Sequence, residues 1–171
     1  MTLDRRQFLA AAAAIPALGA AEPEWGGTVR DGHFHLRPGL DANMRHMEGC
    51  GVTHAVLLAR AGSTEQIRQM QAKYPGKYVW AASTDITKPD AEKILTQAIK
   101  DGALGFGEIK FHVAADGPEL RRMYALAAEL KVPILVHFQE VQHFDGEGVF
   151  STGFRHFEAT LTASPTTTFT A

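Results

Sequence analysis

Two histidines separated by one residue are the clearest chemical feature of the sequence. His33 and His35 follow Asp31 in an extended segment that predicts a β-strand over residues 29–36. Alternate side chains of a strand point to the same side, so we expect His33 and His35 to lie together with Asp31 beneath them. Imidazole is the commonest metal ligand in proteins. The pair therefore indicates a metal site, although two histidines on one strand face can also be solvated or hydrogen-bonded.

A second group of ionisable residues alternates along a later segment. Glu108, Lys110 and His112 would share one face of a strand over 104–111. Burying all three is costly unless a metal ion or mutual pairing compensates their charges. Lys110 can bind a metal only if its charge is removed, for instance by carboxylation; unmodified, it could polarise a substrate carbonyl or orient a carboxylate. We therefore predict catalytic roles for Glu108 and Lys110.

A third strand supplies one more histidine. An apolar run ends abruptly at His137, which in isolation could equally be a satisfied core histidine. Three strand ends that each carry an inward ligand-type residue are harder to explain by chance. We predict that His33, His35 and His137 bind the metal, with Glu108 or Lys110 between them. Such a nitrogen and oxygen shell suits zinc or another divalent ion, where bound water would become a nucleophile near neutral pH.

The elements that must position these residues alternate between strands and helices from residue 28 onward. Apolar runs predict the strands, and one-sided apolar stripes with glycine or proline at their ends predict the helices. We expect strands at about 29–36, 54–58, 78–83, 104–111, 133–138 and 166–170. We expect helices at about 41–48, 64–74, 90–100, 118–130 and 154–163. A loop over 139–152 separates the fifth strand from the last helix.

Repeated βα units of this kind predict an α/β fold with a parallel sheet covered by helices. Two architectures satisfy that pattern. A doubly wound open sheet would be complete with five or six strands, whereas an eight-stranded barrel typically needs about 250 residues. The polar residues at strand ends favour the barrel, because a parallel barrel displays its chemistry at the C-terminal ends of its strands.

Composition excludes several classes of protein. The chain has 171 residues, of which 45% are hydrophobic and 21% charged, with a net charge of −2. This balance is ordinary for a globular protein, and there is no basic stripe to bind nucleic acid. After the N-terminal segment, no apolar run reaches the roughly 20 residues of a membrane span. The single cysteine, Cys50, excludes an internal disulfide framework, and we expect it to be a small buried apolar residue.

The N-terminus predicts a targeting segment over residues 1–21, ahead of a barrel domain over 22–171. Arg5 and Arg6 precede Phe-Leu and an alanine-rich apolar run that ends in small residues. This order resembles a twin-arginine signal, and the alternative is an alanine-rich N-terminal helix. The resemblance implies recognition by the twin-arginine export machinery, and a periplasmic or extracellular location.

The strand-end motifs resemble those of the metal-dependent amidohydrolase superfamily, in particular its amidohydrolase-related branch, amidohydrolase 2. The likeness covers about residues 28–169. The segment 31–35 matches the first-strand metal motif, 107–110 is similar to the fourth-strand segment, and 136–137 to the fifth-strand histidine. The resemblance implies a (β/α)8 TIM barrel with one or two divalent metals that activate water for hydrolysis, or in some branches assist decarboxylation.

The resemblance also implies two site residues that this sequence does not contain. The family places a further histidine at the end of the sixth strand and an aspartate at the end of the eighth. The sequence ends in Thr-Phe-Thr-Ala as the sixth strand begins. We therefore expect a barrel truncated after about five to six βα units, inactive as this fragment.

Four histidines receive no role from the pattern. His46 and His156 fall within predicted helices and should face solvent. His54 begins a strand at the end of the barrel away from the site. His143 lies in the loop after the fifth strand and could reach a substrate, or be an ordinary loop residue.

The sequence thus predicts a metal-dependent hydrolase acting on a C–N or C–O bond of a small-molecule substrate. A metal-dependent decarboxylase of the same superfamily is an alternative. A non-enzymatic periplasmic domain that binds a metal or small ligand is another. Neither the substrate nor the oligomeric state follows from the residues, because specificity in a barrel resides in loops after the strands.

Overall fold

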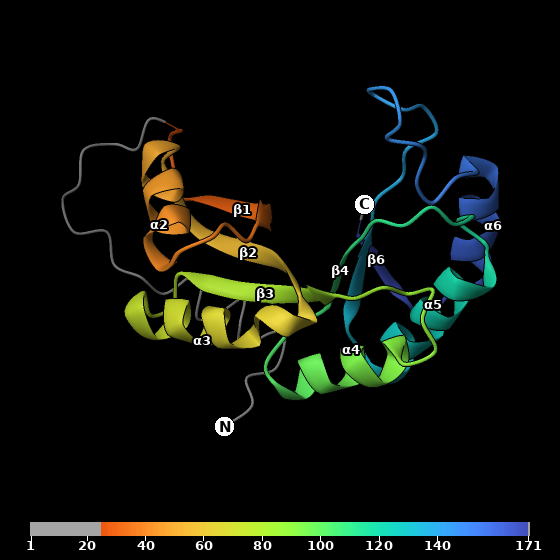
Figure 1. Ribbon diagram of the computed structural model, residues 1–171, viewed down its shortest axis with the longest axis horizontal. Coiled ribbons are helices and arrows are strands. Elements are labelled where there is room, and N and C mark those ends of the chain that lie inside the picture. The colour runs from red at the N-terminus through yellow and green to blue at the C-terminus, as the bar shows by residue number, and fades with distance from the viewer. Residues whose placement is uncertain (1–24, 171) are drawn as a thin grey trace.

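The computed structural model describes residues 25–170 and consists of one parallel sheet with helices packed against it (Figure 1). The segment predicted to be a twin-arginine signal, residues 1–21, lies outside the described residues. Its export role stays a prediction.

Strands and helices alternate along the whole described chain. The strands are β1 (Val29–His35), β2 (Val52–Arg60), β3 (Tyr78–Ser83), β4 (Phe106–Ile109), β5 (Pro133–Val136) and β6 (Thr168–Thr170). The helices are α2 (Leu40–Gly49), α3 (Thr64–Lys73), α4 (Ala91–Lys100), α5 (Pro118–Leu130) and α6 (Phe154–Ala163), with a short 3₁₀ turn, η1 (Ala61–Ser63), before α3. All six predicted strands and five predicted helices are therefore present.

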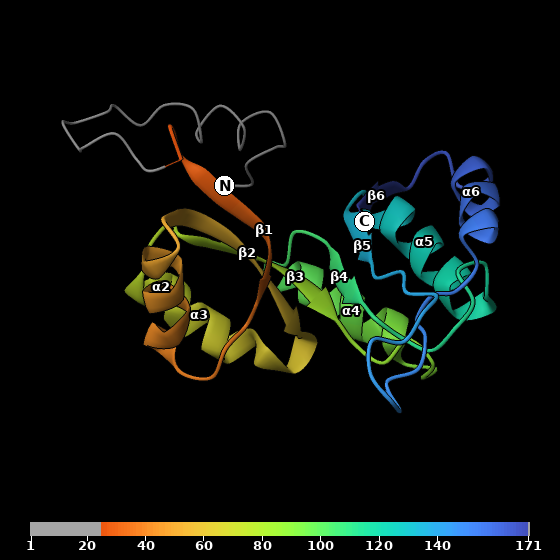
Figure 2. The ribbon, with the colours of Figure 1, turned by 90° about the horizontal axis from the view of Figure 1, so that it is seen from above.

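The order of the strands decides between the two predicted architectures. They lie side by side in chain order, β1 to β6, and every neighbouring pair is parallel. A doubly wound sheet reverses its strand order at a switch point, and this sheet does not. The sheet instead curves as a half-barrel with its helices on the outer side (Figure 2). The α/β barrel-type fold predicted from the sequence is confirmed as a six-stranded half-barrel.

The register is regular between β2 and β3, and it shifts in β1 and β4 where ligand-type residues lie. A further shift, between Val29 and Arg30, lies at the start of β1, away from those residues. From β2 to β3, pairing runs without interruption from Ala55 opposite Tyr78 to Arg60 opposite Ser83. In β1, the three-residue step from Asp31 to Phe34 faces a two-residue step in β2. In β4, the step from Phe106 to Ile109 faces a two-residue step in β5. Each of these strands thus carries one extra residue, as in a β-bulge.

The hydrophobic core fills the layer between sheet and helices. Aromatic and aliphatic side chains from both layers are almost fully buried there, because each helix presents one apolar stripe to the sheet. The largest fully buried members are Trp80, Tyr124, Phe106, Met47, Leu57, Ile67, Met70, Ile86, Leu95, Ile109, Leu120 and Met123. This core fixes the strands whose ends carry the candidate site.

Two sequence predictions need correction. The strand predicted over 104–111 spans only Phe106–Ile109, so Lys110 and His112 lie beyond its end and do not continue its alternation. The extra residue in β4 breaks the period of two on which that prediction depended. Cys50, predicted to be buried, is exposed, because it follows the last turn of α2.

Among residues 25–170, no helix is both long enough and apolar enough to cross a membrane.

Candidate metal centre

The first strand brings His33 and His35 to the same place, as the spacing predicts. Their ring centroids are 5.1 Å apart. Phe34, between them, is buried in the core, and this anchors the alternation. The Asp31 carboxylate accepts a hydrogen bond of 2.8 Å from the backbone N–H of His33, across the extra residue of β1. Asp31 therefore fixes the end of the strand that carries the histidines.

The fourth strand supplies a carboxylate to the two imidazoles. Glu108 lies between two buried residues, Phe106 and Ile109, and its side chain is only 8% exposed. Its Oε2 atom is 3.7 Å from Nε2 of His33 and 3.5 Å from Nε2 of His35. A bulge commonly re-aims a side chain beside an active site, and the extra residue of β4 falls at this position.

The three side chains fit the requirements of a divalent cation. One ligand atom from each of His33, His35 and Glu108 lies within 4.8 Å of the others. A tetrahedral zinc ion bound at about 2.1 Å places its ligand atoms roughly 3.4 Å apart, which is close to the separations from Glu108 Oε2. Two neutral imidazoles and one carboxylate also match the three protein ligands of catalytic zinc sites, which keep a fourth position for water.

His137 lies immediately beyond β5 and contacts the other oxygen of the same carboxylate. Its backbone N–H donates to the Ile109 carbonyl at 3.1 Å, which aligns it with the end of β4. Its Nδ1 is 2.5 Å from Glu108 Oε1, and its Nε2 is 3.0 Å from Gln139 Oε1. Both ring nitrogens therefore already have partners. The predicted ligand role of His137 stays a prediction, and the geometry places Glu108 in the ligand group instead.

Lys110 and His112 lie beside this centre rather than within it. Lys110 Nζ is 3.8 Å from a Glu147 carboxylate oxygen and 4.6 Å from the centre of the Phe150 ring. The His112 ring stacks on Phe150 at 4.2 Å, and its Nδ1–H donates to the Val149 carbonyl at 2.7 Å. The predicted catalytic role of Lys110 stays a prediction, with its ammonium near the loop after β5.

Three residues of that loop, Gln139, Glu147 and Phe150, were not found by sequence reasoning. All three are buried or nearly buried. The backbone N–H of His143, and then the side-chain amide of Gln139, hold the pKa of Glu147 below its usual value, although burial opposes them. No periodicity links loop residues to strand ends, so the only available signal was the polar, glycine-containing composition of 139–152.

The remaining histidines lie away from the centre or at its margin. His46 and His156 are exposed on α2 and α6, as predicted. His54 lies near the start of β2, opposite Arg30, where burial lowers its pKa and the charges of Lys77 and Arg30 lower it further. His143 is exposed on the loop.

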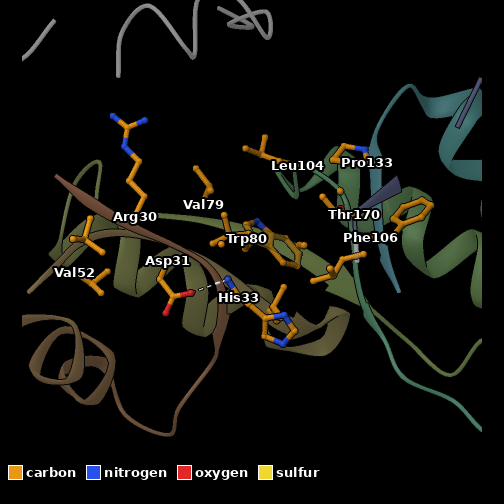
Figure 3. Close-up of a pocket in the computed structure, with 17 residues that line it drawn as sticks. Arg30, Asp31, His33, Val52, Val79, Trp80, Leu104, Phe106, Pro133 and Thr170 are labelled. Carbon is orange, nitrogen blue, oxygen red and sulfur yellow. Dashed lines mark hydrogen bonds between the residues drawn. The ribbon is translucent and has the colours of Figure 1, made fainter. Parts of the chain in front are cut away.

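The inner face of the half-barrel forms an open groove of about 730 Å³ below the centre (Figure 3). Its wall is mainly apolar and includes Val56, Val79, Leu104, Pro133 and Leu135. Of the three candidate ligands, His33 lines the groove, whereas His35 and Glu108 do not. The groove is therefore the inner wall of the sheet and not a pocket over the three ligands.

Comparison with known proteins supports the fold and goes no further. No protein-family model matches the sequence, and no curated protein sequence matches it significantly. A solved protein from Staphylococcus aureus assigned as an amidohydrolase matches with a TM-score of 0.60 and 15% identity, over 83% of this chain and 65% of that one. The 2,6-dihydroxybenzoate decarboxylase from Rhizobium matches with a TM-score of 0.57 and 14% identity, over 83% of this chain and 64% of that one. The chain thus shares their fold and spans about two thirds of their length.

Proposed function

We propose that this half-barrel belongs to a metal-dependent hydrolase of the amidohydrolase type, which uses water to cleave a C–N or C–O bond. One observation carries the proposal: ligand atoms of His33, His35 and Glu108 lie within 4.8 Å of one another. They do so at the C-terminal edge of a parallel sheet, where barrel enzymes hold their active sites. The amidohydrolase-type protein that shares the fold is consistent with this assignment.

The residues around the ligands suit hydrolysis. A divalent cation held by His33, His35 and Glu108 supplies Lewis-acid polarisation and makes water a nucleophile near neutral pH. His137 holds Glu108 through Oε1, which leaves Oε2 directed to the two imidazoles. Lys110 carries an ammonium group near the same edge, suited to polarising a substrate carbonyl or orienting a carboxylate.

Decarboxylation is the second candidate function. The observation that favours it is the match to the 2,6-dihydroxybenzoate decarboxylase structures, one of which was solved as a complex with 2,6-dihydroxybenzoate. A domain that only binds a metal would use the same three ligands without turnover. Metal content and turnover together separate these alternatives.

The test is to measure bound zinc in the 171-residue protein and in single variants. We expect one bound ion in the wild type. His35→Ala and Glu108→Gln should weaken binding by more than the roughly 10- to 100-fold typical of changes outside the ligand set. His156→Ala, which removes an exposed imidazole from α6, is the matched control and should bind normally. A wild-type protein without bound metal would contradict the proposal.

Two further measurements refine it. If His137 is itself a ligand, His137→Ala should lose as much metal as His35→Ala; if it only holds Glu108, the loss should be smaller. Turnover of esters, lactones and amides would identify a hydrolase, and release of carbon dioxide from hydroxybenzoates a decarboxylase. Metal binding without either activity would favour a binding domain or the incomplete barrel expected from the sequence.

A further inference from the structure

The loop after β5 folds back onto the segment that follows β4. Gln139 and Phe150 exchange two backbone hydrogen bonds of 2.9 Å, which close the loop as an antiparallel bridge. Beyond the bridge, the Ser151 N–H donates to the Phe111 carbonyl at 3.1 Å, and the Thr152 N–H donates to that of Val113 at 3.2 Å. Both ends of the loop are thus fixed next to the candidate metal centre, while its tip, which in the chain comes between β5 and α6, projects away from the sheet at the top of Figure 1.

Gln139 is a buried polar residue at the base of this loop. It is 6% exposed, and both ends of its side-chain amide are used. Nε2 donates to a Glu147 carboxylate oxygen at 2.7 Å, so Oε1 must face His137, whose Nε2–H donates to it at 3.0 Å. A carboxylate only accepts hydrogen bonds, and this fixes the orientation of the amide. Glu147 therefore determines which atom Gln139 presents to His137.

Glu147 is itself held by the loop. Its carboxylate is nearly buried and accepts the backbone N–H of His143 at 2.8 Å as well as the Gln139 amide. Lys110 lies 3.8 Å away and supplies a positive charge. The rings of Phe150 and His137 pack at nearly a right angle, with centroids 5.7 Å apart and planes at 89°. The His137 ring is thus constrained by hydrogen bonds at both nitrogens and by packing on one side.

We propose that Gln139 is a positioning residue of the metal centre. It acts through a polar chain of four residues, Glu147, Gln139, His137 and Glu108, which fixes the direction in which Glu108 presents Oε2 to His33 and His35. This inference rests on the proposed metal centre. The physical reason is that Glu108 has two oxygens: holding Oε1 on an immobilised imidazole removes the side-chain rotations that would carry Oε2 away from the ligand group. A group hydrogen-bonded directly to a metal ligand, as His137 is to Glu108, is worth about 10- to 100-fold in metal affinity, and Gln139 acts one step further from the metal.

The first arm of the test measures metal. Zinc affinity and the visible spectrum of the cobalt-loaded protein are compared for the wild type, Gln139→Met and Gln142→Met. Gln142 is exposed on the same loop, so the same substitution there is the matched control. We expect Gln139→Met to weaken zinc binding by up to about 10-fold, the lower end of the range for direct partners of a ligand, and to alter the cobalt spectrum, whereas Gln142→Met should do neither.

The second arm separates the hydrogen bond from folding. Glu147→Gln keeps an oxygen that can accept from Gln139, whereas Glu147→Leu does not. Metal affinity should therefore be largely retained in Glu147→Gln and reduced in Glu147→Leu to the level of Gln139→Met. Equal affinity in these two variants and the wild type would overturn the proposal.

The third arm needs no metal. In the metal-free protein, the His137 Nε2–H proton should give a slowly exchanging resonance because Gln139 protects it, and Gln139→Met should abolish that resonance while Gln142→Met retains it. If the resonance behaves in this way but the wild type binds no metal, the proposed function fails and the polar chain stands as a structural feature without the positioning role. If metal binds normally and Gln139→Met changes neither affinity, spectrum nor resonance, the positioning role is wrong and the proposed function stands.

Discussion

The central strand pair and the ligand-bearing strands follow different rules. β2 and β3 pair in unbroken register and contribute large buried side chains such as Trp80. β1 and β4 each carry an extra residue, beside His33 and at Glu108. Regular pairing buries apolar surface well, but it fixes every side chain to one of two faces. The difference teaches that the regular strands stabilise the sheet, and that the irregular strands aim the ligands.

Glycine explains how β4 tolerates its irregularity. An added Cβ at Gly105 would lie 2.6 Å from the Pro133 carbonyl oxygen, and one at Gly107 would lie 2.7 Å from Leu135 Cβ. β5 thus approaches β4 so closely that no larger residue fits at these two positions. Gly107 also has a φ of 146°, a conformation that other residues rarely adopt.

The largest expected effect is a loss of stability when a buried side chain of the regular pair, β2 and β3, is removed. Trp80→Ala removes a side chain that is 1% exposed, and should lower the free energy of unfolding by about 3–5 kcal/mol, because a cavity remains. Zinc affinity of the folded fraction should stay within a few-fold of wild type. Trp25→Ala, at a tryptophan that is 66% exposed, is the control and should cost less than about 1 kcal/mol. Urea unfolding and zinc titration of both variants measure these effects. A stable Trp80→Ala protein that had lost its metal would contradict the idea that the regular strands stabilise the sheet without orienting the ligands.

A smaller loss of stability should follow a substitution in β4, one of the two strands with an extra residue. Gly107→Ala forces a methyl group against Leu135 and should cost about 1–3 kcal/mol from overpacking. Unlike Trp80→Ala, it should also weaken zinc binding, since any relief of the clash moves Glu108. Gly62→Ala, where an added Cβ would meet nothing within 4 Å, is the control. The idea is wrong if Gly107→Ala unfolds earlier yet binds zinc as tightly as the wild type.

The smallest effect concerns pH and the loop beside β4 and β5. The folded-state pKa of Glu147 is lowered from 4.5, mainly by the His143 backbone N–H. Its ionised form therefore stabilises the protein fully above pH 4.5, and that contribution disappears as pH falls through the folded value. Glu147→Gln should be less stable than wild type at pH 7, and the gap should close in acid. Urea midpoints at several pH values test this, with Glu65→Gln at an exposed carboxylate as control; a gap that widened in acid would refute it.

The same comparison explains which predictions from sequence succeeded. β3 and α5 have the predicted bounds, since an uninterrupted apolar run and a proline-led amphipathic segment obey simple periods. The strand at β4 was predicted too long because a period of two assumes one residue per step of register. His33 and His35 come together as predicted, because they need only one strand.

The polar chain could not be predicted, for a different physical reason. Gln139 and Glu147 contact each other because a loop closes through backbone hydrogen bonds to Phe150. Loop closure depends on three-dimensional packing and leaves no repeating pattern in the residues. The sequence predicted that Glu108 or Lys110 completes the shell of histidines. The structure selects Glu108, because β4 ends at Ile109 and Lys110 lies beyond it, a boundary that a period of two does not reveal.

The strand order also determines the order in which the ligand residues can come together during synthesis on the ribosome. Each new strand pairs with the one made just before it, so the sheet can grow from β1 as the chain emerges. His33 and His35 are synthesised with β1, but Glu108 is synthesised only with β4. The residues that hold Glu108 follow later still, after β5. The complete ligand group therefore does not exist while the first three strands assemble. A metal ion bound at the proposed centre would therefore meet a sheet of at least four strands, and its affinity would stabilise the later strands rather than start the fold.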